Sequence, residues 1–339
     1  MKSTLSYFNA SLLFCVMAML GAWFLGGFKA VLTVTFLTML ETSLSFDNAV
    51  VNAGVLQHWN AVWRRRFLTW GILIAVFGMR LIFPLVIVGV AGHLGPWHVL
   101  DLAVNGPDEY SRILTSTHHE IAAFGGAFLM MVFLHFFVAR HKTEHWLKMV
   151  ERPLARLGKL ESIEGALTLA LILLAAALLD AEALRPGFVI AGVWGVITYI
   201  LSKGLAALLG GDEEDGTHQV IRQGVGGFVY LELLDASFSF DGVVGAFAMT
   251  SNLFIIALGL GAGAMFVRAF TLLMVDRGIL NHYRYLEHGA FWAIGGLAAI
   301  MLLGVEYHIP EAVTGLFGGL LIALSLASSV FANRRDSKS

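Results

Sequence analysis

The sequence has little charge and almost no cysteine. Only 14% of its 339 residues are charged and the formal net charge at pH 7 is −2. Soluble domains carry about 25% charged residues, so this composition excludes an ordinary cytosolic enzyme and offers no basic surface for nucleic acid. The single cysteine, Cys15, excludes a disulfide framework and a cysteine-based zinc or iron–sulfur site. Phosphate-loop, zinc-protease and nucleophile-elbow motifs are also absent, so we expect no enzyme.

What the sequence has in abundance is long apolar runs, since 58% of its residues are hydrophobic. A helix that spans a bilayer needs about 20 mostly apolar residues. We expect ten such spans, at residues 6–26, 29–56, 67–92, 119–139, 163–181, 187–209, 220–247, 252–275, 288–305 and 311–332. The sequence therefore predicts an all-α polytopic membrane protein with about ten transmembrane helices.

The basic residues predict the orientation of these spans. With the N-terminus in the cytoplasm, 17 of the 22 Lys and Arg residues fall on the cytoplasmic side. Cytoplasmic loops carry such an excess, so both termini are expected inside. The first span lacks the basic start and the cleavage site of a secretory signal and is expected to be retained.

The chain is expected to form one integral membrane domain in two halves. Residues 1–209 form the first half, which includes a basic cytoplasmic segment at 140–162, and residues 219–339 form the second. An acidic linker at 210–218 joins them. Residues 93–118 are expected to form a loop on the outside.

An internal repeat relates the two halves. Residues Glu41–Val50 and Asp235–Val244 share the pattern of an acid, three residues, and then Ser-Phe-Asp. The span after each copy carries one arginine, Arg80 or Arg268, and the next span carries a Gly-Gly pair. The copies lie on spans 2 and 7, so the repeat unit has five spans and its two copies insert in opposite directions. Many secondary transporters use this inverted arrangement, with the substrate site at the midplane between the halves.

Five acids fall well inside the predicted spans: Glu41, Asp47, Glu232, Asp235 and Asp241. An ionised side chain at the centre of a span costs about 2.5–3.5 kcal/mol on insertion scales, and only Arg80 and Arg268 are there to compensate. Some acids must therefore pair with arginine, take up protons or bind a cation. Alternatively, buried acid–arginine pairs only hold spans together.

The side chains around these acids are hard oxygen donors. Asn48 and Asn52 supply amides, and Ser45, Ser237 and Ser239 supply hydroxyls, although Ser45 and Ser239 are equally expected to bond to their own helix carbonyls. Such ligands favour Mn²⁺, Mg²⁺ or Ca²⁺ over Zn²⁺ or Cu⁺, and ligand chemistry does not choose among the first three.

Helical spacing leaves the direction of Asp47 open. Glu41, Ser45, Asn48 and Asn52 lie within about 60° of one another on a regular helix, while Asp47 lies about 120° from Glu41. Asp241 is turned away from Asp235 by about the same angle. Either the helices unwind locally, or Asp47 and Asp241 face a different neighbour from Glu41 and Asp235.

These motifs resemble those of the TerC-like integral membrane family, named for tellurium-resistance protein C. The copy at Glu41 is similar to that family's acid-x3-Ser-x-Asp-Asn element. The copy at Asp235 is similar to its Glu-x2-Asp-x5-Asp element, followed by Thr250-Ser251-Asn252. Arg80, Arg268 and the segment Tyr285–Gly289 match as well. The chain departs from the family where Gly242-Val243-Val244 replaces a proline-containing sequence. The resemblance implies a multi-pass protein of the bacterial inner membrane, linked to Mn²⁺ efflux and tellurite resistance.

We therefore expect a secondary transporter that exports a divalent cation, preferably Mn²⁺, in exchange for protons. The metal is its substrate, and no permanently bound cofactor is expected. Asp47, Asn48 and Asp241 are expected to bind the ion, with Glu41, Glu232 and Asp235 completing the shell or carrying protons and with Arg80 and Arg268 tuning the site. The alternatives are a non-transporting partner of secretion machinery and, with less support, an intramembrane aspartyl protease. Beyond the lipid bilayer, the sequence leaves open a homo-oligomer or a membrane-protein partner.

Overall fold

All regular structure among the described residues is helical. The computed structural model describes residues 3–71, 73–138, 144–160, 162–209, 223–304, 309 and 311–336, without the side chains at 240, 241, 248, 311 and 312. The predicted acidic linker at 210–218 and residues 140–143 of the predicted basic segment lie outside the described residues.

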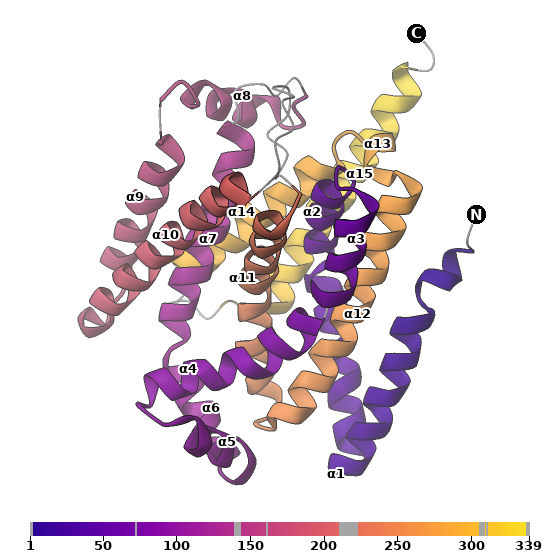
Figure 1. Cartoon of the computed structure of the whole chain (residues 1–339). Helices are drawn as coiled ribbons and strands as arrows, with labels where there is room; N and C mark the ends of the chain where they lie inside the picture. The colour runs from indigo at the N-terminus through magenta and orange to yellow at the C-terminus, as the bar shows by residue number, and fades with distance from the viewer. Residues whose placement is uncertain are drawn as a thin grey trace.

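The elements follow one another along the chain as a series of helices (Figure 1). The first half contains η1 (Thr4–Tyr7), α1 (Asn9–Leu44), α2 (Phe46–Leu56), α3 (Ala61–Arg66), η2 (Phe67–Gly71), η3 (Ile74–Ile82), α4 (Phe83–Ala91), α5 (Pro96–Asn105), α6 (Pro107–Ser116), α7 (His118–Val138), α8 (Lys148–Leu157), α9 (Ile163–Leu178), η4 (Glu182–Leu184) and α10 (Arg185–Leu209). The second half contains α11 (Val225–Met249), α12 (Leu253–Arg277), α13 (Ile279–His282), α14 (Leu286–Leu303) and α15 (Glu311–Asp336). Residues 93–118, expected as a loop, instead form α5 and α6, each of which begins at a proline in its first turn.

Seven helices of the described chain are long and apolar enough to cross a membrane. They are α1, the run Ala61–Ala91, α7, the run Glu182–Leu209, α12, α14 and the Val313–Arg335 part of α15. The helix α9 is apolar but shorter, and α11 is long but carries Glu232, Asp235 and Asp241. This set of helices fits an all-α, multi-pass membrane protein.

The 36-residue helix α1 reverses direction at Gly26–Gly27. Gly27 has φ 63° and ψ −151°, a backbone conformation that is essentially confined to glycine. Ser11 Oγ donates to the carbonyl of Met265, and Thr38 Oγ1 donates to the carbonyl of Gly259 on the same helix, α12. A straight helix would place Ser11 and Thr38 about 40 Å apart. Both arms of α1 therefore pack side by side along α12, as Figure 1 shows at its lower right.

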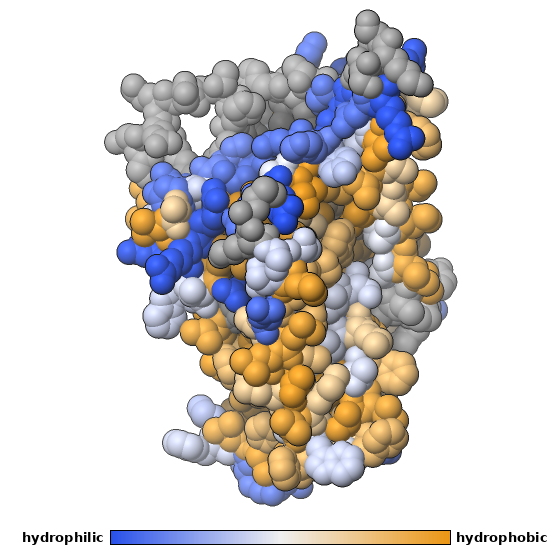
Figure 2. Space-filling view, turned by 90° about the vertical axis from the view of Figure 1, so that its right-hand side faces the viewer, coloured by the Kyte–Doolittle hydropathy of each residue, from blue (hydrophilic) through white to orange (hydrophobic). Residues whose placement is uncertain are grey.

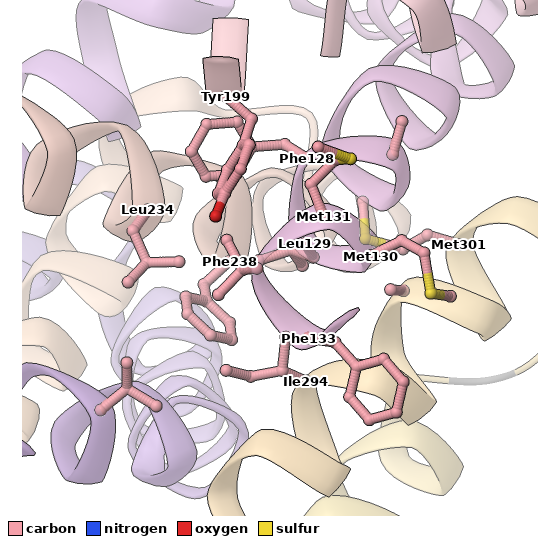
Figure 3. Close-up of a cluster of buried hydrophobic side chains, with 14 of the residues drawn as sticks. Phe128, Leu129, Met130, Met131, Phe133, Tyr199, Leu234, Phe238, Ile294 and Met301 are labelled. Atoms are coloured by element: carbon pink, nitrogen blue, oxygen red, sulfur yellow. The ribbon is translucent and has the colours of Figure 1, made fainter. Parts of the chain in front are cut away.

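The core forms around α7, in which 15 of 21 residues are buried. Figure 3 shows Phe128, Met131 and Phe133 of this helix among side chains from α10, α11 and α14, including Tyr199, Phe238 and Ile294. The helices α7 and α14 run antiparallel and close together. A Cβ at Gly126 of α7 would lie 3.0 Å from Leu302 of α14, and a Cβ at Gly295 of α14 would lie 2.5 Å from the Phe133 ring of α7. Glycine permits this close approach, as is common between membrane helices.

The face of the molecule shown in Figure 2 is apolar between hydrophilic ends. Exposed side chains on α1, α9, α10 and α15 include Phe24, Leu173, Leu201 and Leu316. Both chain termini, α8 and α13 lie at one end of the bundle, and α5 and α6 lie at the other (Figure 1). This distribution is the one expected of helices that face lipid.

Replacing Gly27 with alanine tests the reversal of α1. A Cβ at this position meets no atom within 4 Å, so the cost comes from the backbone conformation alone, about 1–3 kcal/mol of stability. We expect Gly27→Ala to lower the melting temperature of the detergent-solubilised protein. The control is Gly204→Ala on α10, where there is also open space and the backbone is helical; it should be neutral or stabilising. Equal effects of the two changes would contradict the reversal.

Candidate functional site

The site begins with a buried ion pair between α1 and η3. Glu41 lies in the last turn of α1 and is 3% exposed, and Arg80 lies in the π-helix η3 and is 2% exposed. Arg80 Nη2 donates to Glu41 Oε1, while Nη1 donates to the carbonyl of Ala75. This is one of the acid–arginine pairs that the sequence predicted.

A local break in the helix follows Glu41. The helix α1 ends at Leu44, Ser45 has φ −94° and ψ 18°, and α2 begins at Phe46. Backbone bonds from Ser45 N to Glu41 O and from Ala49 N to Ser45 O continue across the break, so the chain bends without separating. Ser45 Oγ donates to Glu41 Oε1 over 3.0 Å, which means that its hydroxyl binds the carboxylate and not a helix carbonyl.

The second motif meets the first through Asp235 of α11. Asn48 Nδ2 and Asn52 Nδ2, one turn apart on α2, both donate to Asp235 Oδ1, the latter over 3.3 Å. A Cβ at Gly242 of α11 would lie 3.3 Å from Glu41 Oε2. The two motif copies, about 190 residues apart in the sequence, therefore face each other along antiparallel helices.

These side chains line one small cavity of ≈40 Å³. Its lining includes Glu41, Ser45, Asn48, Asn52, Arg80, Asp235, Arg268 and Thr271. A volume of about 10–15 Å³ is enough for one water molecule, so the cavity has room for a small ion with part of its hydration shell. Seven of the predicted site residues are thus brought together around one space.

Asp47 faces a different space. It is buried and lines a second cavity of ≈30 Å³, which it shares with Glu41, Phe238 and Gly242. Its Oδ1 accepts the backbone N–H of Asn48 over 2.8 Å. The spacing left two alternatives open: a local break in the helix, or a different neighbour for Asp47. The structure shows both in the first copy, because the helix breaks at Ser45 and Asp47 lines the second cavity. The helix α11 is continuous from Val225 to Met249, so no corresponding break occurs in the second copy.

Glu232 lies next to the first cavity. A Cβ at Gly71, a residue that lines this cavity, would collide with Glu232 Oε1. Both carboxylate oxygens of Glu232 are buried, and neither has a hydrogen-bond partner among the described residues. The Oδ1 atoms of Asn48 and Asn52 are likewise buried without a hydrogen-bond partner among the described residues. Four oxygen acceptors around the site are therefore buried without a donor, which is costly unless a cation or a proton reaches them.

The other predicted residues are placed less closely. Ser239 is buried on α11 but lines neither of these cavities, and the side chain of Asp241 lies outside the described residues. Arg268 lines the first cavity, yet it makes no ion pair with a described side chain. Among the described side chains, no group of three or more His, Cys, Asp or Glu residues is arranged to hold a metal ion. A cation here would have to draw on amide and hydroxyl oxygens as well as carboxylates.

Thr271 is a lining residue that the sequence analysis did not single out. Its Oγ1 donates to the carbonyl of Val267 over 3.0 Å and lies 3.5 Å from the carbonyl of Ala49 on α2. Thr271 follows Arg268 by three residues, which is close to one helical turn. This spacing would have indicated from the sequence that Thr271 lies on the same helix face as Arg268.

The Glu41–Arg80 pair generates a double-mutant prediction. Removing one partner leaves a buried charge unpaired, so Glu41→Gln and Arg80→Gln should each cost about 3–5 kcal/mol of stability, and the double variant should cost less than either. Thermal unfolding in detergent measures these differences. The control is Arg112→Gln, which breaks the exposed pair with Glu109 on α6 and should leave stability unchanged. Additive effects of the two buried changes would contradict the pairing.

Comparison with known proteins gives one result. No curated protein and no solved structure matches the chain. Residues 46–336 match the family described as "Protein of unknown function (DUF475)". The matched range contains α2, the second motif and all of α12, and it begins after Glu41 and Ser45. Since it covers most of the sequence, the chain belongs to the DUF475 family.

Proposed function

We propose that this chain is a secondary transporter that moves a divalent metal cation, preferably Mn²⁺, through the site between α2 and α11. The observation that carries the proposal is the group of buried oxygen acceptors without donors at Asn48, Asn52 and Glu232, beside the carboxylates of Glu41 and Asp235. Hard oxygen ligands of this kind suit Mn²⁺, Mg²⁺ and Ca²⁺. The metal is the cargo, and the carboxylates exchange it for protons.

The proposal includes ten spans in two inverted repeats. Ten helices follow the predicted spans in order. The first two are the arms of α1, of which the second is continued by α2. The others are the run Ala61–Ala91, α7, α9, α10, α11, α12, α14 and α15. In the proposed order, α2 and α11 take equivalent positions of the two repeats. An odd number of spans per repeat then accounts for their antiparallel directions.

Paired contacts support a two-fold relation between the repeats. In the motif register, Glu41 corresponds to Asp235 and Asn48 corresponds to Gly242. The contact of Asn48 with Asp235 and the approach of Gly242 to Glu41 are then the same contact, made once from each side. Exchange of this kind is what a two-fold axis through the site produces.

A second pair of contacts follows the same rule. Thr38 corresponds to Glu232, and Gly71 corresponds to Gly259 in the register that aligns Arg80 with Arg268. Thr38 Oγ1 donates to the carbonyl of Gly259 over 3.1 Å, and Glu232 lies against Gly71. The equivalent positions thus meet equivalent partners, but one carries a hydroxyl and the other carries a carboxylate.

The charges favour a cation over an anion as cargo. Arg80 is already neutralised by Glu41, and three further acids remain: Asp47 is buried, and Asp235 and Glu232 are half-buried. An anion entering this site would meet like charges at low dielectric, which is strongly unfavourable. Arg268 is the other arginine on the lining, and we assign to it the role of tuning the charge of the site.

The setting of the transporter is part of the same proposal. The resemblance of its motifs to TerC-like proteins supports Mn²⁺ export and a bacterial inner membrane. Both termini and α8, with its basic side chains, lie at one end of the bundle, and the excess of basic residues there supports a cytoplasmic position for that end (Figure 1).

Flux measurements in liposomes test the proposal. The purified chain should carry Mn²⁺ faster than Mg²⁺, Ca²⁺ or Zn²⁺, and a pH gradient should change the rate. Asp235→Asn and Asn48→Ala should lower Mn²⁺ flux by at least about tenfold, because each removes oxygen ligands or their support. Glu109→Gln, on the exposed surface of α6, is the matched control and should leave the flux unchanged. Absence of flux in a folded wild-type protein would favour the non-transporting partner.

Thermal unfolding gives an independent measure of binding. A ligand that binds only the folded state stabilises it, by about 2.7 kcal/mol at 100 times its dissociation constant. We expect Mn²⁺ to raise the melting temperature of the wild-type protein and of Glu109→Gln, and to have no effect on Asp235→Asn. A rise of equal size in all three proteins would place the metal elsewhere.

A further inference from the structure

The helix α8 has three distinct faces. Taking Lys148 as the origin and about 100° per residue, Lys148, Arg152 and Arg156 lie within about 80° of one another. Met149, Val150 and Pro153 lie on the adjoining arc, and Glu151 and Leu154 lie on the remaining one. The basic side chains are exposed, and so are Met149, at 91%, and Val150, at 47%.

The third face fixes α8 to the bundle. Glu151 is 1% exposed, and its carboxylate accepts hydrogen bonds from the backbone N–H groups of Trp146 (2.9 Å) and Leu147 (3.1 Å). It also accepts the indole N–H of Trp292 on α14 over 3.0 Å. His145 and His288 lie 3.6 and 3.7 Å from the same carboxylate. Leu154 packs on the main core, and Gly158 lies against the carbonyl of Val138 at the end of α7.

This attachment determines what the other two faces meet. The helix lies across one end of the bundle, beside the ends of α7 and α9 (Figure 1). Its basic arc and its exposed apolar arc are neighbours and both point away from the core. Helices with this pairing of faces lie in the membrane interface, and their basic residues are attracted by anionic headgroups.

We propose that α8 is a docking helix for anionic phospholipid headgroups of the bilayer in which the chain lies. Lys148, Arg152 and Arg156 contact the headgroup charges, and Met149 and Val150 enter the acyl boundary. Glu151 fixes the orientation of α8 through its hydrogen bond to Trp292 of α14. Charge complementarity selects this occupant: Lys148, Arg152 and Arg156 make no ion pair with another side chain in the described part of the chain. The inference does not depend on metal transport.

The test uses the full-length chain with one fluorophore on α8. Cys15→Ala removes the only cysteine, and Met149→Cys then accepts an environment-sensitive NBD label. The protein is reconstituted in phosphatidylcholine vesicles with or without about 30% phosphatidylglycerol. We expect the NBD emission to move to shorter wavelength in the anionic vesicles. Each basic residue near an anionic surface strengthens the association of a helix with that surface about fivefold, so the three residues of α8 together strengthen it about 100-fold.

Charge variants identify the source of the response. The triple variant Lys148→Gln, Arg152→Gln, Arg156→Gln should lose the spectral shift, and Arg152→Lys with Arg156→Lys should keep it, because charge and not side-chain shape is what the headgroups attract. Arg334→Gln with Arg335→Gln, in the last turn of α15, is the control and should also keep it. Identical spectra in the two kinds of vesicle, as expected if α8 binds a protein or a second copy, would overturn the proposal. A shift that persists in the triple variant would overturn it too.

Discussion

The cost of placing an ionised carboxylate inside a low-dielectric bundle governs the centre of this protein. Glu41 is almost completely buried, and it is tolerated because Arg80 and Ser45 both donate to the same carboxylate oxygen. Asp235 is held in a comparable way by the amides of Asn48 and Asn52. Glu41 and Asp235 thus each accept two hydrogen bonds, and these bonds fix how α1, α2, η3 and α11 lie relative to one another. The site and the fold share one set of interactions.

Glycine makes room for these carboxylates. A side chain on Gly263 of α12 would collide with the stem of Glu41, and one on Gly71 would collide with Glu232. In both cases the acid lies directly against the backbone of a neighbouring helix. Membrane helices associate through such close backbone contacts, because lipid supplies no hydrophobic force to drive them together. In this protein the same contacts bring polar groups within reach of the cavity.

The sequence was sufficient to predict an all-α chain with long apolar helices, because apolar runs are local properties of the chain. It also predicted that an arginine neutralises an acid, as Arg80 does for Glu41. It did not predict α5 and α6, which lie in a segment expected to be a loop. The direction of Asp47 was not predictable, since it depends on the break at Ser45 and on which helix packs there. Glu151 was overlooked within a basic segment, although it is among the most buried polar residues of the chain. Its partner Trp292 is distant in sequence, and periodicity within one helix carries no information about such a contact.

The reversal at Gly26–Gly27 has a consequence for the order of synthesis. The two arms of α1 form a hairpin that is synthesised before η3, and Lys29 is its only basic residue near the tip. Glu41 therefore precedes Arg80 by 39 residues at the ribosome. During that interval the carboxylate has no arginine to neutralise it, and an unpaired charge inside the bilayer is costly. The ion pair at the centre of the finished protein can therefore form only after the run Ala61–Ala91 has been synthesised.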